Sequence, residues 1–168
     1  MLFETERVSV RQWTSDDLSD LHNLYADPGM SDYIGPKLHI SETKRIFEDQ
    51  LFQYNNTPGL GRFVIIDKLS SSFIGILLIR TLEEKNSVEL GYAFKKDSWG
   101  KGLATEVVSE SLQHIFQSTP FSTIYAFTEL NNFNSKNVLS KCGFFQLDDI
   151  YQDGEEMNSF CITNSKVK

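Results

Sequence analysis

Residues 87–106, SVELGYAFKKDSWGKGLATE, join an alternating apolar segment to a lysine between two glycines and then to good helix formers. The alternation over Val88–Phe94 predicts a strand, and the apolar residues that follow Lys101 recur at helical spacing. Gly100 and Gly102 therefore lie where a strand passes into a helix. Because the first N–H groups of a helix lack internal partners and carry the positive end of its dipole, this junction is suited to an anion.

Two nucleotide-binding motifs fail on this stretch. A P-loop needs a glycine where Lys95 stands and a serine or threonine where Gly102 stands. A dinucleotide fingerprint needs a third glycine where Thr105 stands, and it needs strands and helices that alternate throughout the chain. A tight turn without any ligand is the remaining alternative for the two glycines.

The preceding strand has two unlike faces. One face carries Val88, Leu90, Tyr92 and Phe94, and the other carries Glu89, Gly91 and Ala93. Glycine weakens the interior of a strand unless another group approaches its backbone closely. We therefore expect a slender ligand arm along Gly91 and Ala93 with its phosphates at the helix mouth, which is the shape of coenzyme A.

The order of predicted elements is strand, two helices, three strands, helix, strand, helix and two strands. Short connections predict antiparallel hairpins among the three central strands, and the strand–helix–strand step over 88–128 predicts a right-handed parallel crossover. No linker or repeat divides the chain. Residues 1–168 are expected to form one domain of an α/β fold (α+β type), with a mixed, mostly antiparallel central sheet of about six or seven strands flanked by about four helices.

Composition limits the partners of the chain. The 23 acidic residues against 16 Lys and Arg give a net charge of −7, which argues against a nucleic-acid partner and is compatible with a cationic one. No apolar run of about 18 residues predicts a membrane span, and the N-terminus lacks a secretory signal, so a cytoplasmic location is expected. Cys142, Cys161 and three scattered histidines fit no metal spacing, so no metal is expected.

Two stretches, VELGYAFKKDSWGKGLATE (88–106) and NNFNSKNVLSKCGF (131–144), closely resemble the GNAT superfamily of acetyl-CoA-dependent N-acetyltransferases. A third, ETERVSVRQWTSDDLSDLHNLYADP (4–28), is similar to the RimJ/RimL branch of ribosomal-protein N-terminal acetyltransferases, so the resemblance covers nearly the whole chain. One departure is Trp99, where the superfamily often has Gln or Arg. We interpret this tryptophan as a feature of the branch.

The resemblance implies that acetyl-CoA lies in a V-shaped opening between the strand that ends at Phe94 and the strand over 123–128. Backbone groups of Ala93 and Phe94 would pair with the pantetheine amides. Asn132 would reach the arm from the other side, and Ser135 would also contact the coenzyme. The pyrophosphate would lie at the helix mouth, against Trp99, Gly100, Lys101, Gly102, Leu103, Ala104 and Thr105.

By the same resemblance, the acceptor amine attacks the thioester directly in a ternary complex. Glu89 is the candidate base, because it is the only ionisable group on its face of the strand, although a solvated carboxylate is the alternative. Ser135 matches a proposed thiolate proton donor of related N-terminal acetyltransferases, and its alternative role is a helix N-cap. An N–H of the strand, such as that of Phe94, would stabilise the tetrahedral oxygen. Tyr33 and Tyr151 are weaker candidates for the acid or the acceptor pocket.

The resemblance leaves the acceptor open. A protein N-terminal α-amino group is favoured, while a polyamine, an amino sugar, an antibiotic or a role as a non-catalytic acetyl-CoA sensor remain alternatives, as do a monomer and a homodimer. Deprotonation at neutral pH costs about 1 kcal/mol for an α-amino group of pKa ~8, against about 4.6 kcal/mol for an ammonium of pKa ~10.4. A dispensable Glu89 would therefore favour an N-terminal substrate.

Overall fold

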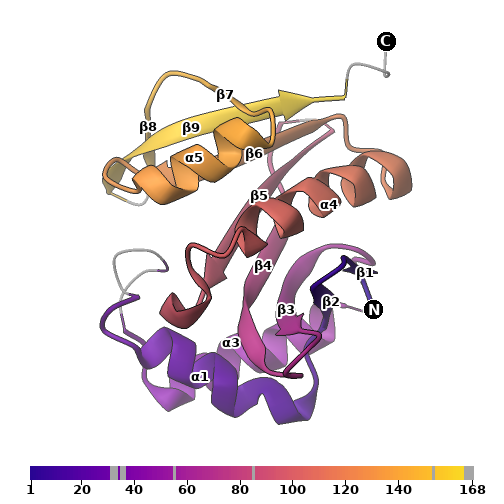
Figure 1. The fold of residues 1–168 in the computed structure, drawn as a ribbon, viewed down its shortest axis with the longest axis vertical. Coiled ribbons are helices and arrows are strands. Elements are labelled where there is room, and N and C mark those ends of the chain that lie inside the picture. Colours follow the sequence, from indigo (N-terminus) through magenta and orange to yellow (C-terminus); the bar gives the residue numbers. More distant parts are fainter. Residues whose placement is uncertain (31–33, 35–36, 55, 85, 153, 165–168) are drawn as a thin grey trace.

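The computed structural model describes residues 1–30, 34, 37–54, 56–84, 86–152 and 154–164. Its centre is a nine-stranded sheet in the order β1-β2-β3-β4-β5-β6-β9-β7, with β8 paired to β9 (Figure 1). The strands are β1 (Phe3–Glu4), β2 (Val8–Gln12), β3 (Gly61–Asp67), β4 (Phe73–Thr81), β5 (Ser87–Phe94), β6 (Thr123–Glu129), β7 (Phe145–Gln146), β8 (Ile150–Gln152) and β9 (Glu155–Thr163). The described α-helices are α1 (Leu18–Ala26), α3 (Ile40–Gln53), α4 (Leu103–Ser118) and α5 (Phe133–Lys141), with short 3-10 turns η1 (Ser15–Asp17) and η2 (Lys96–Ser98).

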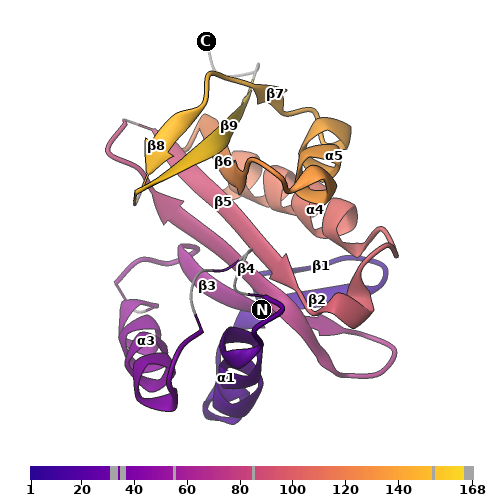
Figure 2. The same ribbon diagram turned by 90° about the vertical axis from the view of Figure 1, so that its left-hand side faces the viewer.

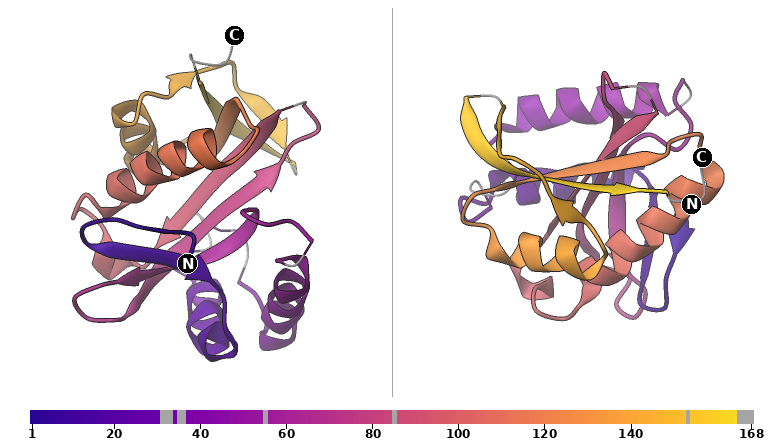
Figure 3. Two further views of the ribbon diagram at one scale, coloured as in Figure 1. Left: turned by 90° about the vertical axis from the view of Figure 1, so that its right-hand side faces the viewer. Right: turned by 90° about the horizontal axis from the view of Figure 1, so that it is seen from above.

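The expected fold class is confirmed. All described strand pairs are antiparallel except β5 with β6, which are joined through α4 by the predicted parallel crossover. The sheet has more strands than expected because β1, β7 and β8 are only two or three residues long, too short for an alternating pattern to stand out. Seen from above, α3 lies on one side of the sheet and α4 and α5 lie on the other (Figure 3).

The core joins these layers. On α4, Val107, Val108 and Ile115 are fully buried, and on β5 Val88 and Leu90 are buried in the same hydrophobic cluster. This is the helical face that the apolar spacing after residue 101 predicts. Burial of both elements in one cluster fixes the start of α4 relative to the end of β5.

The parallel pairing of β5 and β6 is short. It joins Ser87 to Thr123, Val88 to Ile124 and Glu89 to Tyr125, and it ends there. Figure 2 shows β5 running on from this point away from β6 and β9, toward the start of α4. β4 stays paired with β5 as far as Phe94, so only the opposite edge of the C-terminal half of β5 borders an opening.

Of the glycines in β4 and β5, Gly75 and not Gly91 is required by close packing. A Cβ at Gly75 would clash with the backbone carbonyl oxygen of Ala93 across the β4–β5 pair. A Cβ at Gly91 would lie 3.5 Å from the side chain of Leu78, which is an ordinary packing distance. The close approach to glycine backbone in this part of the sheet therefore comes from a neighbouring strand.

We predict that Gly75→Ala lowers the free energy of unfolding by about 1–3 kcal/mol, the usual cost of overpacking against atoms that cannot move. The matched variant Gly91→Ala should change it by less than about 0.5 kcal/mol. Urea denaturation of both variants measures the difference. Equal losses would contradict this assignment of the two glycines.

Candidate functional site

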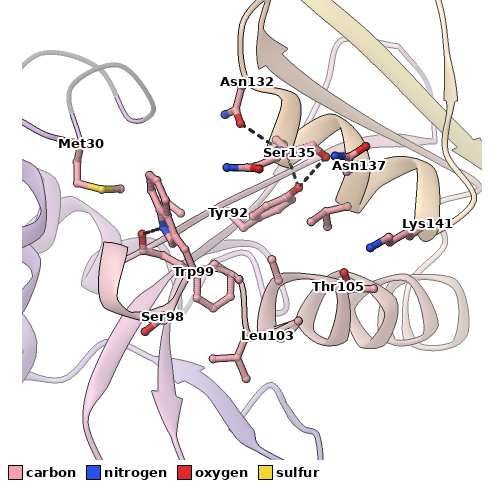
Figure 4. A pocket seen from close by; sticks show the side chains of 17 residues that line it. Met30, Tyr92, Ser98, Trp99, Leu103, Thr105, Asn132, Ser135, Asn137 and Lys141 are labelled. Atoms are coloured by element: carbon pink, nitrogen blue, oxygen red, sulfur yellow. Dashed lines mark hydrogen bonds between the residues drawn. The ribbon is translucent and has the colours of Figure 1, made fainter.

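A cavity of about 380 Å³ opens between the end of β5, the start of α4 and the first turns of α5 (Figure 4). Ten of the eleven residues predicted to hold the coenzyme line it: Ala93, Phe94, Trp99, Gly100, Gly102, Leu103, Ala104, Thr105, Asn132 and Ser135. The exception is Lys101, which is exposed beside the cavity. Residues that are 42 positions apart in the chain are thus brought to one cavity.

The mouth of α4 needs its two glycines for backbone reasons. Gly100 has a φ of 71° and Gly102 a φ of 76°, in the left-handed region that strains any residue with a side chain. Gly102 is the N-cap of α4 and has no side chain to offer the first N–H groups of the helix. No described atom lies within 4 Å of the place where a Cβ of Gly100 would stand. The two alternatives for these glycines, a tight turn and a helix N-terminus open to an anion, are therefore compatible, because one backbone conformation produces both.

The N-terminal segment holds this mouth in place. The Glu106 carboxylate, in the first turn of α4, accepts hydrogen bonds from the Thr5 hydroxyl, from the Arg7 N–H at 3.0 Å and from Arg7 Nε at 2.6 Å. Arg7 Nη1 also donates to the carbonyl of Lys101 at 2.8 Å. Burial acts to raise the pKa of Glu106, but the hydrogen bonds from Thr5 and Arg7 outweigh it, so this pKa lies below its usual value. Single-sequence reasoning missed this contact because 99 residues separate its partners.

The opposite wall is the start of α5. The Asn132 side chain accepts the Ser135 N–H at 3.1 Å and is the N-cap of this helix, while its amide donates to Glu129 at 3.1 Å. The cap role considered for Ser135 is therefore wrong, because the asparagine three residues earlier fills it. The Ser135 hydroxyl instead lies 3.0 Å from the hydroxyl of Tyr92.

Tyr92 is one of the cavity residues that sequence reasoning missed, together with Met30, Ser98, Asn134, Asn137, Val138 and Lys141. Sequence reasoning expects the ligand arm along Gly91 and Ala93. Of these two only Ala93 lines the cavity, and Tyr92 lines it from the other face of β5. Burial raises the pKa of Tyr92 to about 12. The alternation of β5 places Tyr92 on the same face as Val88, Leu90 and Phe94, which are buried in the core. It could not show that Tyr92 borders a cavity, because that depends on where β6 diverges.

Trp99 links the two elements that form the cavity. Its indole Nε1 donates to the Phe94 carbonyl at 2.7 Å, across the turn between β5 and α4. The Phe94 carbonyl, expected to serve a pantetheine amide, thus already accepts one hydrogen bond. Trp99 lines the cavity, and its hydrogen bond also fixes the end of the strand relative to the start of α4.

Glu89 lies apart from this cavity. Its carboxylate pairs with Arg80 Nε at 2.7 Å, and Arg80 is its directly opposite neighbour on β4. Glu89 is 9% exposed. It is the only ionisable group on its face of β5. The alternative of a solvated carboxylate is wrong, because Glu89 is buried and pairs with a cross-strand partner that cannot be read from one strand.

A second, open groove lies beside Glu84, Tyr125, Phe127 and Asp148. The rings of Tyr125 and Phe127 stack with centroids 6.4 Å apart, and the Tyr125 hydroxyl donates to Glu84 at 2.7 Å. That hydrogen bond raises the pKa of Tyr125 to about 12. Tyr151 is 77% exposed and is not among the groove's lining residues, and Tyr33 lies outside the described residues.

We predict that Glu106→Gln lowers the free energy of unfolding by at most about 1 kcal/mol at pH 7, the upper value for a pair that solvent reaches. Because the folded-state pKa of Glu106 is lowered, its stabilisation is present above the ordinary glutamate value of 4.5 and is lost as the pH falls through the folded-state value. The deficit of the variant should therefore shrink between pH 7 and pH 3.5 in urea denaturation. A constant deficit would contradict the ion pair with Arg7.

Within the part of the chain that the structure describes, no group of three or more His, Cys, Asp or Glu side chains is arranged to hold a metal ion. No described helix is both long enough and apolar enough to cross a membrane.

Comparison with known proteins agrees with this geometry. The model of the acetyltransferase (GNAT) domain matches residues 7–145. The uncharacterized N-acetyltransferase p20 of Bacillus licheniformis is 28% identical over 158 residues, covering 90% of this chain and 86% of its own.

Two solved structures share the fold. The ribosomal-protein-S5-alanine acetyltransferase of Vibrio fischeri superposes with a TM-score of 0.82 at 21% identity, over 99% of this chain and 98% of its own. The spermidine N-acetyltransferase of Vibrio cholerae, in complex with CoA and spermine, superposes with a TM-score of 0.81 at 19% identity, over 96% and 97% of the two chains. With the family model spanning most of its length, this chain belongs to the GNAT acetyltransferase family and is an acyltransferase.

Proposed function

We propose that this protein transfers the acetyl group of acetyl-CoA directly to the α-amino group of a polypeptide N-terminus. The coenzyme part rests on the cavity. The N–H groups of Leu103, Ala104 and Thr105 are the first of α4, and Gly100 and Gly102 leave them accessible to a pyrophosphate. The pantetheine arm would follow the end of β5, with Asn132 and Ser135 on the opposite wall.

The choice of a polypeptide N-terminus as the acceptor rests on the Arg80–Glu89 ion pair. The carboxylate that would remove a proton from the amine is held by a guanidinium at 2.7 Å and would have to leave it to do so. An α-amino group of pKa ~8 is about a tenth neutral at pH 7 without any enzymic base, whereas an ammonium of pKa ~10.4 is neutral in fewer than about one molecule in a thousand. The engaged Glu89 therefore favours the more acidic amine.

The open groove agrees with this acceptor. Its stacked Tyr125 and Phe127 offer flat apolar surface, and Glu84 and Asp148 add negative charge. An extended N-terminal segment with a cationic end matches both features. The same carboxylates also suit a polyamine, which is the second candidate, and the solved spermidine acetyltransferase shows that this fold hosts such a substrate.

Coenzyme binding is tested by thermal shift. At about one hundred times their dissociation constants, acetyl-CoA and CoA should each add about 2.7 kcal/mol, a rise in Tm of roughly 5–10 °C for a chain of this size, while ATP and NAD should add little. Ala104→Asp should abolish this rise, because a carboxylate at the helix mouth repels the pyrophosphate. Ala104→Asn is its uncharged control and should retain most of it. A rise with ATP or NAD alone would overturn the coenzyme assignment.

The acceptor is tested with peptides that carry either a free N-terminus or a blocked N-terminus with one lysine, alongside spermidine. We expect acetylation at the free N-terminus by mass spectrometry, and little on the other two. Glu89→Gln should lower the rate with the N-terminal peptide by less than tenfold, well below the roughly 100-fold or larger loss that follows removal of a general base. Faster transfer to spermidine, with a large loss in this variant, would favour the polyamine instead.

A further inference from the structure

We propose that Tyr92 is a positioning residue for acyl transfer: its phenol holds the Ser135 hydroxyl in the cavity and replaces the proton that Ser135 gives to the departing thiolate. The inference rests on the proposed use of acetyl-CoA and assigns a role to a side chain that the proposed function leaves without one.

Geometry is the first argument. The phenol oxygen of Tyr92 lies 3.0 Å from Ser135 Oγ, and both residues line the cavity from opposite walls, β5 and the first turn of α5 (Figure 4). The Tyr92 ring is held edge-on to that of Phe94 at 6.5 Å. The Ser135 N–H is held by Asn132. Both hydroxyls are therefore fixed through their own elements before any ligand binds.

The second argument is that the Ser135 hydroxyl does not cap α5. Asn132 caps α5, so the hydrogen bond with Tyr92 is the side-chain contact that orients Ser135 Oγ. Tyr92 also forms only a long contact, 3.5 Å, with the Ser135 carbonyl. The Tyr92 phenol therefore contacts mainly the Ser135 hydroxyl, as a residue that orients a proton donor must do.

The proton balance closes with these two groups. The amine nitrogen forms a bond to the carbonyl carbon, the C–S bond breaks, and its electron pair leaves on sulfur. The Ser135 hydroxyl proton moves to that sulfur, and the Tyr92 phenol proton moves to Ser135 Oγ. The proton lost by the amine nitrogen passes to solvent, and solvent returns one to the phenolate. One proton leaves nitrogen and one reaches sulfur.

Proton donation to the thiolate costs less with the hydroxyls of both Ser135 and Tyr92 than with that of Ser135 alone. An aliphatic hydroxyl is a far weaker acid than a phenol, whose ordinary pKa is ~10, so transfer of the negative charge to Tyr92 costs less than its retention on Ser135. Burial raises the pKa of Tyr92 to about 12, so the phenol stays protonated and available at neutral pH.

The experiment compares Tyr92→Phe, Ser135→Ala and the double variant in single-turnover acetyl transfer to the acceptor that the wild-type protein uses fastest, with CoA affinity measured by calorimetry. Tyr92→Phe keeps the ring and removes one oxygen. We expect a loss of about 10- to 100-fold in the transfer rate with CoA affinity within twofold. Ser135→Ala should lose at least as much, and the double variant should be no slower than Ser135→Ala, because the two hydroxyls act in series.

Tyr54→Phe is the matched control. Tyr54 is also a buried phenol with a pKa raised to about 12, and it donates to the Arg62 carbonyl and accepts from the Trp13 N–H far from the cavity. Tyr54→Phe should lower Tm and leave the transfer rate unchanged, as expected for a hydroxyl with a purely structural role.

Three results would overturn the inference: an unchanged transfer rate in Tyr92→Phe, a loss confined to CoA affinity, or single losses that multiply in the double variant. If Tyr92→Phe does not fold, a Ser135→Ala protein that transfers acetyl at the wild-type rate overturns it as well. If the wild-type protein and Tyr92→Phe bind CoA and transfer acetyl equally well, only this inference is refuted. A wild-type protein that does neither refutes the proposed function together with it.

Discussion

The site depends on one limit in the sheet, the end of parallel pairing between β5 and β6 at Glu89 and Tyr125. Val88 and Leu90, one on each side of this limit, are buried in the core. Beyond it the backbone of β5 borders an opening, and the next side chain on the same face, Tyr92, lines a cavity. Unpaired strand backbone is costly when it is buried, so this half of β5 is suited to an extended, amide-bearing partner that completes its hydrogen bonds.

The mouth of α4 is stabilised by residues remote from it in the chain. Arg7 and Thr5 surround the Glu106 carboxylate, and Arg7 also reaches the Lys101 carbonyl. A helix mouth that is to bind an anion without side chains needs its backbone fixed in advance, because every loose dihedral would have to be ordered on binding. The two glycines provide access, and the remote ion pair provides the rigidity.

The two faces of β5 divide the proposed chemistry. On the side of α4, Tyr92 and Ser135 approach each other where the thiolate would leave. On the other side, Glu89 is engaged by Arg80, next to a groove that carries carboxylates and stacked rings. A single strand with period two can therefore present a proton source to the coenzyme and an acidic surface to the acceptor without either interfering with the other.

The sequence by itself determined the order of elements, the parallel crossover and the residues of the helix mouth, because alternation, helical spacing and glycine at a strand–helix junction are local signals. Ten of the residues that the family resemblance implies for the coenzyme line one cavity. Only the tertiary structure decided that Asn132 is the cap in place of Ser135, that Arg80 engages Glu89, that Arg7 holds Glu106 and that Tyr92 faces Ser135. The contacts of Arg7 with Glu106 and of Tyr92 with Ser135 join elements far apart in the chain. Arg80 and Glu89 are nine residues apart on adjacent strands, and their pairing depends on the register of β4 and β5. Their distances depend on how those elements pack, which no local pattern records.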